Sequence, residues 1–307
     1  MSEAVMWKEA INQEDYTPAA AKAAGEVVEL PDGRAGVVIT DLAASQAGAV
    51  YTKGIFKMAK TTSMVVIKGQ LLYWDATNSK VKYTGDFPVG TAFTDGLAAD
   101  TTIYVVLNGT VNPRVSLQKG RWNKTETLGL GVTRNGEEFT LAMDAVAEAS
   151  TAAIYSTDSV ACADDPVWEG WVAIYDIGDD AALDINFGLA NGTHATDCDS
   201  ITESCFFHLD GSALSILVES DDGTTEVAAD DSTIVAVDDT YAFYQIDARD
   251  LSDVKAYING VLQGGGETLV LSAATGPLIA IVHCEKTSND TTCDVRVKDM
   301  HIRTVPA

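Results

Sequence analysis

The sequence predicts an all-β protein in two parts, a small β-barrel followed by a β-sandwich. Short runs of β-branched and aromatic residues recur along nearly all of the 307 residues. Asn-Gly and Asp-Gly pairs separate many of these runs and favour tight hairpin turns. Only two short segments, 2–13 and 142–149, have a helix-like pattern. Strands at this spacing are typical of barrels and sandwiches.

The segment 41–75 shows the barrel pattern most clearly. Three short β-rich runs, 49–51, 55–58 and 71–74, are interrupted by Gly48, Gly54 and Gly69. Glycine takes a positive φ at a turn without steric cost. The segment contains no Ser/His/Asp set, no cysteine pair and no phosphate loop, so we expect it to act through its shape and surface.

The second part continues the same alternation. Across both parts, further strands are expected at 36–40, 64–67, 103–107, 171–175, 213–218, 234–237, 242–246, 255–258, 278–282 and 294–297. We place the domain boundary at Asn112-Pro113, giving parts 1–112 and 113–307. A boundary near 149–153, where the charge balance changes, is the alternative. The earlier one is preferred because 138–143 is predicted to be a strand that pairs with the chain's end.

Charge is spread unevenly. The net charge is −25; residues 1–150 carry 14 basic and 17 acidic residues, whereas residues 151–307 carry 6 and 28. Such an acidic part is repelled by nucleic acid and by anionic lipids, so neither is expected as a partner. The alternative interpretation is that acidic surface only keeps the protein soluble. No apolar run approaches the length of a membrane span, and no secretory signal is expected at the N-terminus.

All five cysteines lie in the second part. Cys198 and Cys205 bracket one short polar stretch, and Cys284 and Cys293 bracket another that is predicted to be a hairpin tip. A disulfide across each hairpin is feasible and would suit an exposed particle. Free thiols, as in a protein made in the bacterial cytoplasm, are the equally open alternative.

The sequence offers no catalytic set, and we expect no enzyme, no cofactor and no metal. The four histidines, His194, His208, His283 and His301, show neither metal-ligand spacing nor a nucleophile motif. The glutamates show no paired-carboxylate motif of a glycoside hydrolase and are expected on loops. Aspartate-rich turns, such as 221–223 and 230–231, lack EF-hand spacing and are expected to be solvated loops.

Residues 23–108, taken together, resemble the small β-barrel family of bacteriophage capsid decoration, or cement, proteins. The resemblance rests on the order and spacing of short motifs rather than on any single one. The clearest is Leu72-Tyr73-Trp74-Asp75, preceded by Gly69. The others lie at 24–28, 36–38, 47–50, 54–56, 80–81, 90–92 and 100–107.

This resemblance implies a structural protein of the virion. It would bind the major capsid protein on the outer surface of the shell, commonly as a homotrimer, and stabilise the shell. Phe56, Tyr73 and Trp74 are candidate interface residues, since aromatic side chains dominate many interfaces. The alternative for Trp74 is a place in the core, because it lies in an alternating strand.

Residues 117–307 resemble a concanavalin- or laminin-G-like jelly-roll sandwich, through segments 241–246, 254–261 and 295–303. Such sandwiches often bind glycans, so host-surface glycans are an alternative partner of the virion. Trp168 and Trp171 are candidates for stacking on a sugar ring, although Trp171 is favoured as a core residue.

Overall fold

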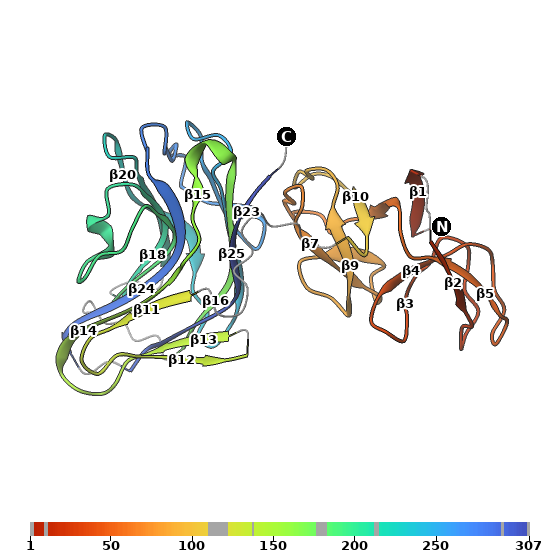
Figure 1. The fold of residues 1–307 in the computed structure, drawn as a ribbon, viewed down its shortest axis with the longest axis horizontal. Coiled ribbons are helices and arrows are strands. Elements are labelled where there is room, and N and C mark those ends of the chain that lie inside the picture. The colour runs from red at the N-terminus through yellow and green to blue at the C-terminus, as the bar shows by residue number, and fades with distance from the viewer. Residues whose placement is uncertain are drawn as a thin grey trace. The chain divides into compact units, whose positions relative to one another are not determined.

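The computed structural model describes residues 3–8, 12–109, 122–136, 138–175, 183–211, 215–289 and 292–305. These residues form an all-β structure, which confirms the predicted fold class (Figure 1). Their only helices are two single 3-10 turns, η1 (Cys162–Asp164) and η2 (Cys198–Ser200). No helix in these ranges is long and apolar enough to cross a membrane.

The chain divides into two compact units, Met1–Asn112 and Pro113–Ala307. The expected boundary at Asn112-Pro113 falls within residues 110–121, outside the described residues. The two units are described separately below as the N-terminal unit and the C-terminal unit.

The N-terminal unit contains two antiparallel sheets. The larger has the order β1-β6-β10-β9-β7-β8, and the smaller has the order β2-β5-β4-β3. The strands are β1 (Ala4–Lys8), β2 (Gln13–Tyr16), β3 (Val27–Glu29), β4 (Ala35–Val38), β5 (Gly48–Tyr51), β6 (Ile55–Ala59), β7 (Leu71–Asp75), β8 (Lys80–Lys82), β9 (Phe87–Ala92) and β10 (Thr102–Leu107). The helix expected at 2–13 is wrong, because β1 and β2 occupy its described residues.

The described residues of this unit form no closed barrel, so that part of the prediction is corrected. The larger sheet curls until Lys60, just after β6, forms one isolated bridge with Val81 of β8. One isolated bridge is not a continuous ladder of hydrogen bonds, so it does not close the sheet into a barrel. The core instead lies between the curled sheet and strands β3 and β4, where Val27, Ala35 and Val37 join the main apolar cluster.

The side chain of Asn108 joins the two sheets of the N-terminal unit through hydrogen bonds. Its Nδ2 donates to the carbonyl oxygens of Ala35, at 2.8 Å, and Thr52, at 2.9 Å. Its Oδ1 accepts a hydrogen bond from the Ala35 amide at 2.9 Å. Nearby, Gly90 has a φ of +139° and lies so close to β10 that a Cβ would be 2.0 Å from the Val106 oxygen. Glycine is therefore required there.

The C-terminal unit is a sandwich of two antiparallel sheets (Figure 1). One sheet has the order β11-β14-β24-β17-β18-β19-β20, with β15 paired to β24. Its strands are β11 (Trp122–Glu126), β14 (Glu148–Ser156), β15 (Val160–Ala161), β17 (Leu183–Ala190), β18 (Ser204–Asp210), β19 (Ser215–Asp221), β20 (Glu226–Val235) and β24 (Pro277–Asn289). We call it the site sheet.

The second sheet has the order β12-β13-β25-β16-β21-β22-β23. Its strands are β12 (Gly131–Asn135), β13 (Glu138–Ala142), β16 (Pro166–Tyr175), β21 (Ala242–Asp247), β22 (Lys255–Ile258), β23 (Val261–Leu262) and β25 (Asp294–Thr304). We call it the opposite sheet. The expected helix at 142–149 is wrong, since β13 ends at Ala142 and β14 begins at Glu148.

The core of the sandwich is formed by the apolar side chains that alternate inward from both sheets. Ile185, Phe187 and Phe207 of the site sheet meet Trp168 and Tyr244 of the opposite sheet. Trp168 is fully buried, with its ring centroid 6.2 Å from those of Phe187 and Phe207. Trp168 is therefore a core residue and is not available to stack on a sugar.

Candidate functional site

The outer face of the site sheet, turned away from the opposite sheet, carries a row of polar side chains. Since Ile185 and Phe187 point into the core, Asp184 and Asn186 of β17 point outward. The strand register places Asn186 opposite His208 of β18 on one side and opposite His283 of β24 on the other. These side chains belong on one face because successive residues of a strand alternate in direction.

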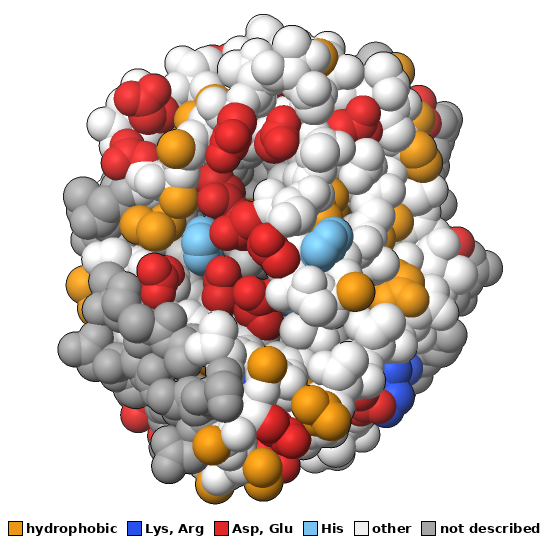
Figure 2. Space-filling view, turned by 90° about the vertical axis from the view of Figure 1, so that its left-hand side faces the viewer, with side chains coloured by type: hydrophobic (Ala, Val, Ile, Leu, Met, Phe, Trp, Pro, Cys, Tyr) orange, Lys and Arg blue, Asp and Glu red, His pale blue; other side chains and the backbone are white. Residues whose placement is uncertain are grey.

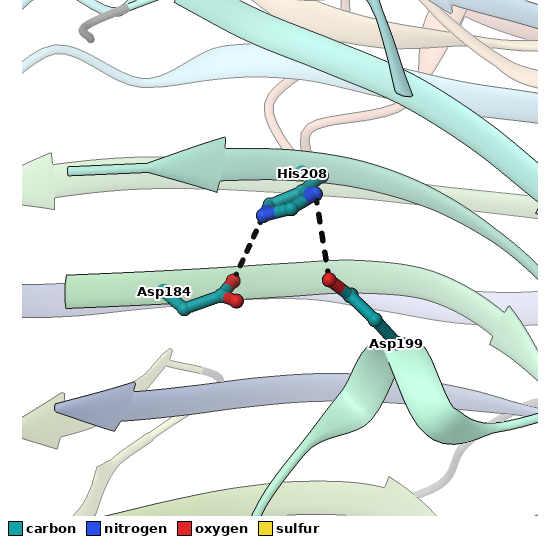
Figure 3. Close-up of side chains that lie close together, drawn as sticks. All are labelled: Asp184, Asp199 and His208. Carbon is teal, nitrogen blue, oxygen red and sulfur yellow. Dashed lines mark ion pairs between the residues drawn. The ribbon is translucent and has the colours of Figure 1, made fainter. Parts of the chain in front are cut away.

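His208 is the centre of an acidic cluster, and Figure 3 shows it with Asp184 and Asp199. Its Nε2 lies 3.0 Å from Oδ1 of Asp184. Its Nδ1 lies 3.4 Å from Oε2 of Glu219 on β19 and 3.9 Å from Oδ2 of Asp199 on η2. The two strands beside β18, β17 and β19, and the η2 turn thus supply carboxylates to a single imidazole. We call Asp184, Asp199, His208 and Glu219 the His208 cluster.

The loop between β17 and β18 positions Asp199 over the sheet. The η2 turn is capped by Asp197, whose carboxylate accepts hydrogen bonds from the Asp199 amide and from the hydroxyl of Ser200. Cys198 at the start of η2 is buried against Phe206 and Ile281 of the outer face. This apolar anchor leaves the side chain of the following residue, Asp199, half exposed beside His208.

Two acidic side chains form hydrogen bonds that hold together the loops at the end of the sandwich where the β17–β18 loop lies. Glu203 accepts hydrogen bonds from the amides of Thr275 and Gly276 and from the side chain of Asn191. Asp222 accepts from the amides of Thr224, Thr225 and Ala273, and it is only 3% exposed. The 221–223 turn is therefore only partly a solvated loop, because Asp222 is a buried structural carboxylate.

The electrostatics of the His208 cluster favour a charged imidazole. Burial alone lowers the pKa of His208, but its hydrogen bonds and charge interactions with Asp184 and Glu219 raise it to about 11. Burial and the neighbouring Glu219 carboxylate raise the pKa of Asp199 well above its ordinary value. The nearby carboxylates contribute to both shifts, since they stabilise the proton on His208 and add to the effect of burial on Asp199.

Figure 2 shows this face of the C-terminal unit as a band of acidic side chains flanked by histidines. A second acid–imidazole pair extends the row, since Nε2 of His283 lies 3.2 Å from Oε2 of Glu285 on β24. Among the described residues, the carboxylates of Asp184, Asp199, Glu219 and Glu285 have only histidines as ion-pair partners. The face therefore carries more negative than positive charge.

The predicted interface residues belong to the N-terminal unit. Phe56 and Trp74 are each 1% exposed and belong to its main apolar cluster. Their alternation in β6 and β7 directs them inward, so they are core residues and not surface contacts. Tyr73, one position along β7 and pointing the other way, is half-buried and stays a candidate.

The structure forms neither predicted disulfide, and all five cysteines are free and buried. Cys205 points into the core between the sheets, whereas Cys198 packs on the outer face. The site sheet therefore separates the two sulfurs. Cys284 and Cys293 are buried in the sandwich core; Cys284 lies within β24 and Cys293 just before β25, and these two strands belong to different sheets. The segment between them is thus a connection between sheets and not a hairpin.

Sequence reasoning missed the His208 cluster altogether. His208, Asp184 and Asp199 have no motif spacing, and only the pairing of β17 with β18 and the return of the η2 loop bring them together. The one available signal was the run from Leu183 to Phe187, in which Asp184 and Asn186 alternate with large apolar residues. Glu219, expected on a loop, lies within β19.

Comparison with known families concerns the N-terminal unit. Residues 11–107 match the model of a family described as phage cement protein. This match confirms the resemblance to phage decoration proteins. It spans β2 to β10 and ends at Leu107, just before Asn108, so it stops short of the C-terminal unit. No curated protein matches the chain.

Solved structures similar to the chain include the carbohydrate recognition domain of Emp47p, with 9% identity and a TM-score of 0.45 over 61% of this chain and 90% of that one. The Ca²⁺-bound exoplasmic/lumenal domain of VIP36 has 10% identity and a TM-score of 0.43, over 63% and 87%. An alginate lyase from Corynebacterium sp. has 11% identity and a TM-score of 0.40, over 60% and 94%. Likeness at this level identifies no ligand.

Proposed function

We propose that the protein decorates the head of a phage, with its N-terminal unit bound to the outer surface of the major capsid lattice. The observation that carries this proposal is the match of residues 11–107 to the phage cement family. That family is structural, which supports a role without catalysis. Bound to the shell, the protein would stabilise it against pressure from the packaged genome.

The assembly we propose is a homotrimer whose C-terminal unit projects into solvent. The charge distribution supports this orientation, because residues 151–307 carry 28 acidic and 6 basic residues, and residues 1–150 are nearly balanced. The charged side chains of a strongly acidic unit stay hydrated when the unit points into solvent, whereas contact with a protein surface would remove part of their water. Three linked copies on a symmetric lattice would also convert weak contacts into tight retention.

We propose that the turn at 97–99 contributes to the contact with the shell. Leu97 is 68% exposed, and Ala98 and Ala99 beside it are exposed as well. The turn is held in shape, because the Leu97 amide donates to the Asp100 carboxylate at 2.7 Å and the Ser63 amide donates to the Ala98 oxygen at 2.9 Å. A preorganised apolar turn loses little conformational entropy when it is buried.

A rebinding assay tests the capsid proposal. Purified protein is added to heads that lack it, and bound protein is measured by sedimentation with the heads. We expect stoichiometric binding and a higher temperature of head disruption. Absence of the protein from purified virions, together with failure to rebind, would contradict the proposal. Native mass spectrometry of the free protein and imaging of decorated heads test the trimer.

A matched pair of substitutions tests the turn. Leu97→Asp is expected to weaken rebinding at least tenfold while leaving the thermal unfolding of the protein unchanged. The control is Leu128→Asp, since Leu128 is 71% exposed but lies in the C-terminal unit. Equal rebinding by the two variants would exclude the turn from the contact.

A second candidate function is the binding of host-surface glycans by the outer face of the site sheet. The observation favouring it is a row of polar groups on strands whose other face is apolar: Asp184 and Glu285 are partly exposed, and the buried Asn186 and His283 contact them from behind. Convergent hydrogen-bonding groups on a rigid sheet are what a sugar requires. A glycan array probed with the full chain, with and without chelator, tests it, and an absence of binding in both conditions excludes it.

A further inference from the structure

The His208 cluster has the composition of a cation site. One nitrogen of His208 and one oxygen each of Asp184 and Asp199 lie within 4.8 Å of one another. They come from three separate elements, β18, β17 and η2 (Figure 3). Carboxylate oxygens and the nitrogen of an imidazole that has lost its proton are ligands that divalent transition ions accept together, so the ion would replace a proton of His208.

An unsatisfied amide beside the cluster provides an independent indication. Asn186 is fully buried, and its Nδ2 donates to Oδ1 of Asp184 at 2.9 Å, so its amide lies against the cluster. Its Oδ1 accepts no hydrogen bond from any described residue. Leaving a buried acceptor without a partner costs about 1–3 kcal/mol. A cation beside Asp184 would give this amide oxygen a partner.

Glu219 presents a second unsatisfied oxygen. Its Oε2 faces His208 Nδ1, while its Oε1 is buried and accepts no hydrogen bond from the described residues. None of the carboxylates in the cluster pairs with a lysine or arginine in the described part of the chain. The negative charge of the cluster is thus balanced by one imidazole alone, although three carboxylates surround it.

We propose that Asp184, Asp199 and His208 bind one divalent transition cation, with Asn186 and Glu219 completing its surroundings. Three carboxylates, one amide and one imidazole offer more oxygen than a tetrahedral zinc site uses and more nitrogen than calcium prefers. Mn²⁺ suits such a mixed set. Because Asp199 lies on η2, the ion would also fix the β17–β18 loop to the sheet.

The test uses the full chain, freed of metal by chelator and dialysed. Electron paramagnetic resonance measures free Mn²⁺ as protein is titrated, and calorimetry repeats the titration with Mn²⁺, Zn²⁺ and Ca²⁺. We expect one Mn²⁺ site per chain, bound more tightly than Ca²⁺, and a rise in the unfolding temperature of the C-terminal unit. Asp199→Asn is expected to weaken Mn²⁺ binding at least about tenfold, since even the loss of an outer-shell partner typically costs about 10–100-fold.

The control variant is Glu267→Gln, which removes one exposed carboxylate of the same unit, in the connection between β23 and β24. It should bind Mn²⁺ as the unaltered protein does. His208→Gln serves as a second ligand variant, and circular dichroism verifies that each variant is folded. No binding of any of the three ions, tighter binding of Ca²⁺ than of Mn²⁺, or binding unchanged by Asp199→Asn would overturn the proposal. Since the titration involves no capsid and no glycan, its result is independent of both functions proposed above.

Discussion

The carboxylate of Glu169 on β16 lies 2.6 Å from the guanidinium of Arg303 on β25, and each side chain is only 2% exposed. Gln245 of β21 donates to the same oxygen at 2.8 Å, and Nε2 of His301 lies 3.0 Å from the other oxygen. Three neighbouring strands of the opposite sheet therefore converge on one buried carboxylate. A buried charge is tolerated only when it is paired and hydrogen-bonded in this way.

Removing the charge of Glu169 should destabilise the C-terminal unit strongly. Glu169→Gln leaves the Arg303 guanidinium buried without its partner, and breaking a buried pair costs about 3–5 kcal/mol. The measurement is urea unfolding followed by tryptophan fluorescence. Asp253→Asn is the control, because its pair with Lys255 is exposed and should be worth less than about 1 kcal/mol. Equal losses of unfolding free energy in the two variants would show that the buried pair stabilises the unit no more than an exposed pair does.

The same carboxylate predicts a dependence of stability on pH. Burial alone raises the pKa of Glu169, but Arg303 and His301 outweigh it and hold the pKa below its ordinary value of 4.5. A pKa lowered by folding contributes stability that is full above about pH 4.5 and is lost as the pH falls toward the folded value. The difference in unfolding free energy between the unaltered protein and Glu169→Gln should therefore shrink as the pH falls below about 4.5. A difference that grows as the pH falls below 4.5 would contradict this sign.

The alternation of apolar and polar residues along the chain was the pattern that predicted most of the strands. The segment 255–258 is a strand with its bounds as expected, because its residues alternate between core and surface and an Asn-Gly turn follows. The helix expected at 2–13 was wrong because a short amphipathic pattern is also compatible with a strand at the edge of a sheet. Strand β1 lies at such an edge. The closed barrel could not be judged from local pattern, since closure depends on how β6 and β8 meet.

The functional site could not be predicted for a related reason. Whether Cys198 and Cys205 share a face depends on the sheet that runs between them, and seven residues of sequence do not reveal it. Likewise, Asp184 and His208 meet only because β17 and β18 pair in one register. A shift of that register by one residue would turn every side chain of β17 to the other face. Long-range pairing, rather than residue type, decides these contacts.

The state of the cysteines gives a direct test. Burial raises the pKa of Cys198, Cys205 and Cys284, so their thiols are both shielded and protonated. Under native conditions, reaction with a thiol reagent such as Ellman's should be slow. In 6 M guanidinium all five cysteines of the chain should react without a reductant. Reaction of Cys162 alone in denaturant would show instead that both bridges form in the protein.

Asn108 is expected to contribute more stability to the N-terminal unit than a turn residue usually does. Asn108→Ala removes three hydrogen bonds, two to carbonyl oxygens and one from the Ala35 amide, that join the two sheets. Each is worth about 1 kcal/mol net, so we expect a loss of about 2–3 kcal/mol in urea unfolding.

Asn78→Ala is the matched control for Asn108→Ala, since the side chain of Asn78 is exposed and donates one hydrogen bond, to Asp75 within the same turn. We expect it to cost less than about 1 kcal/mol, because water replaces an exposed bond easily. The Asn108 substitution should also lower the protection of the Ala35 amide from hydrogen exchange, since that amide loses its acceptor. Unchanged protection at Ala35 would mean that the sheets are joined mainly by their apolar core.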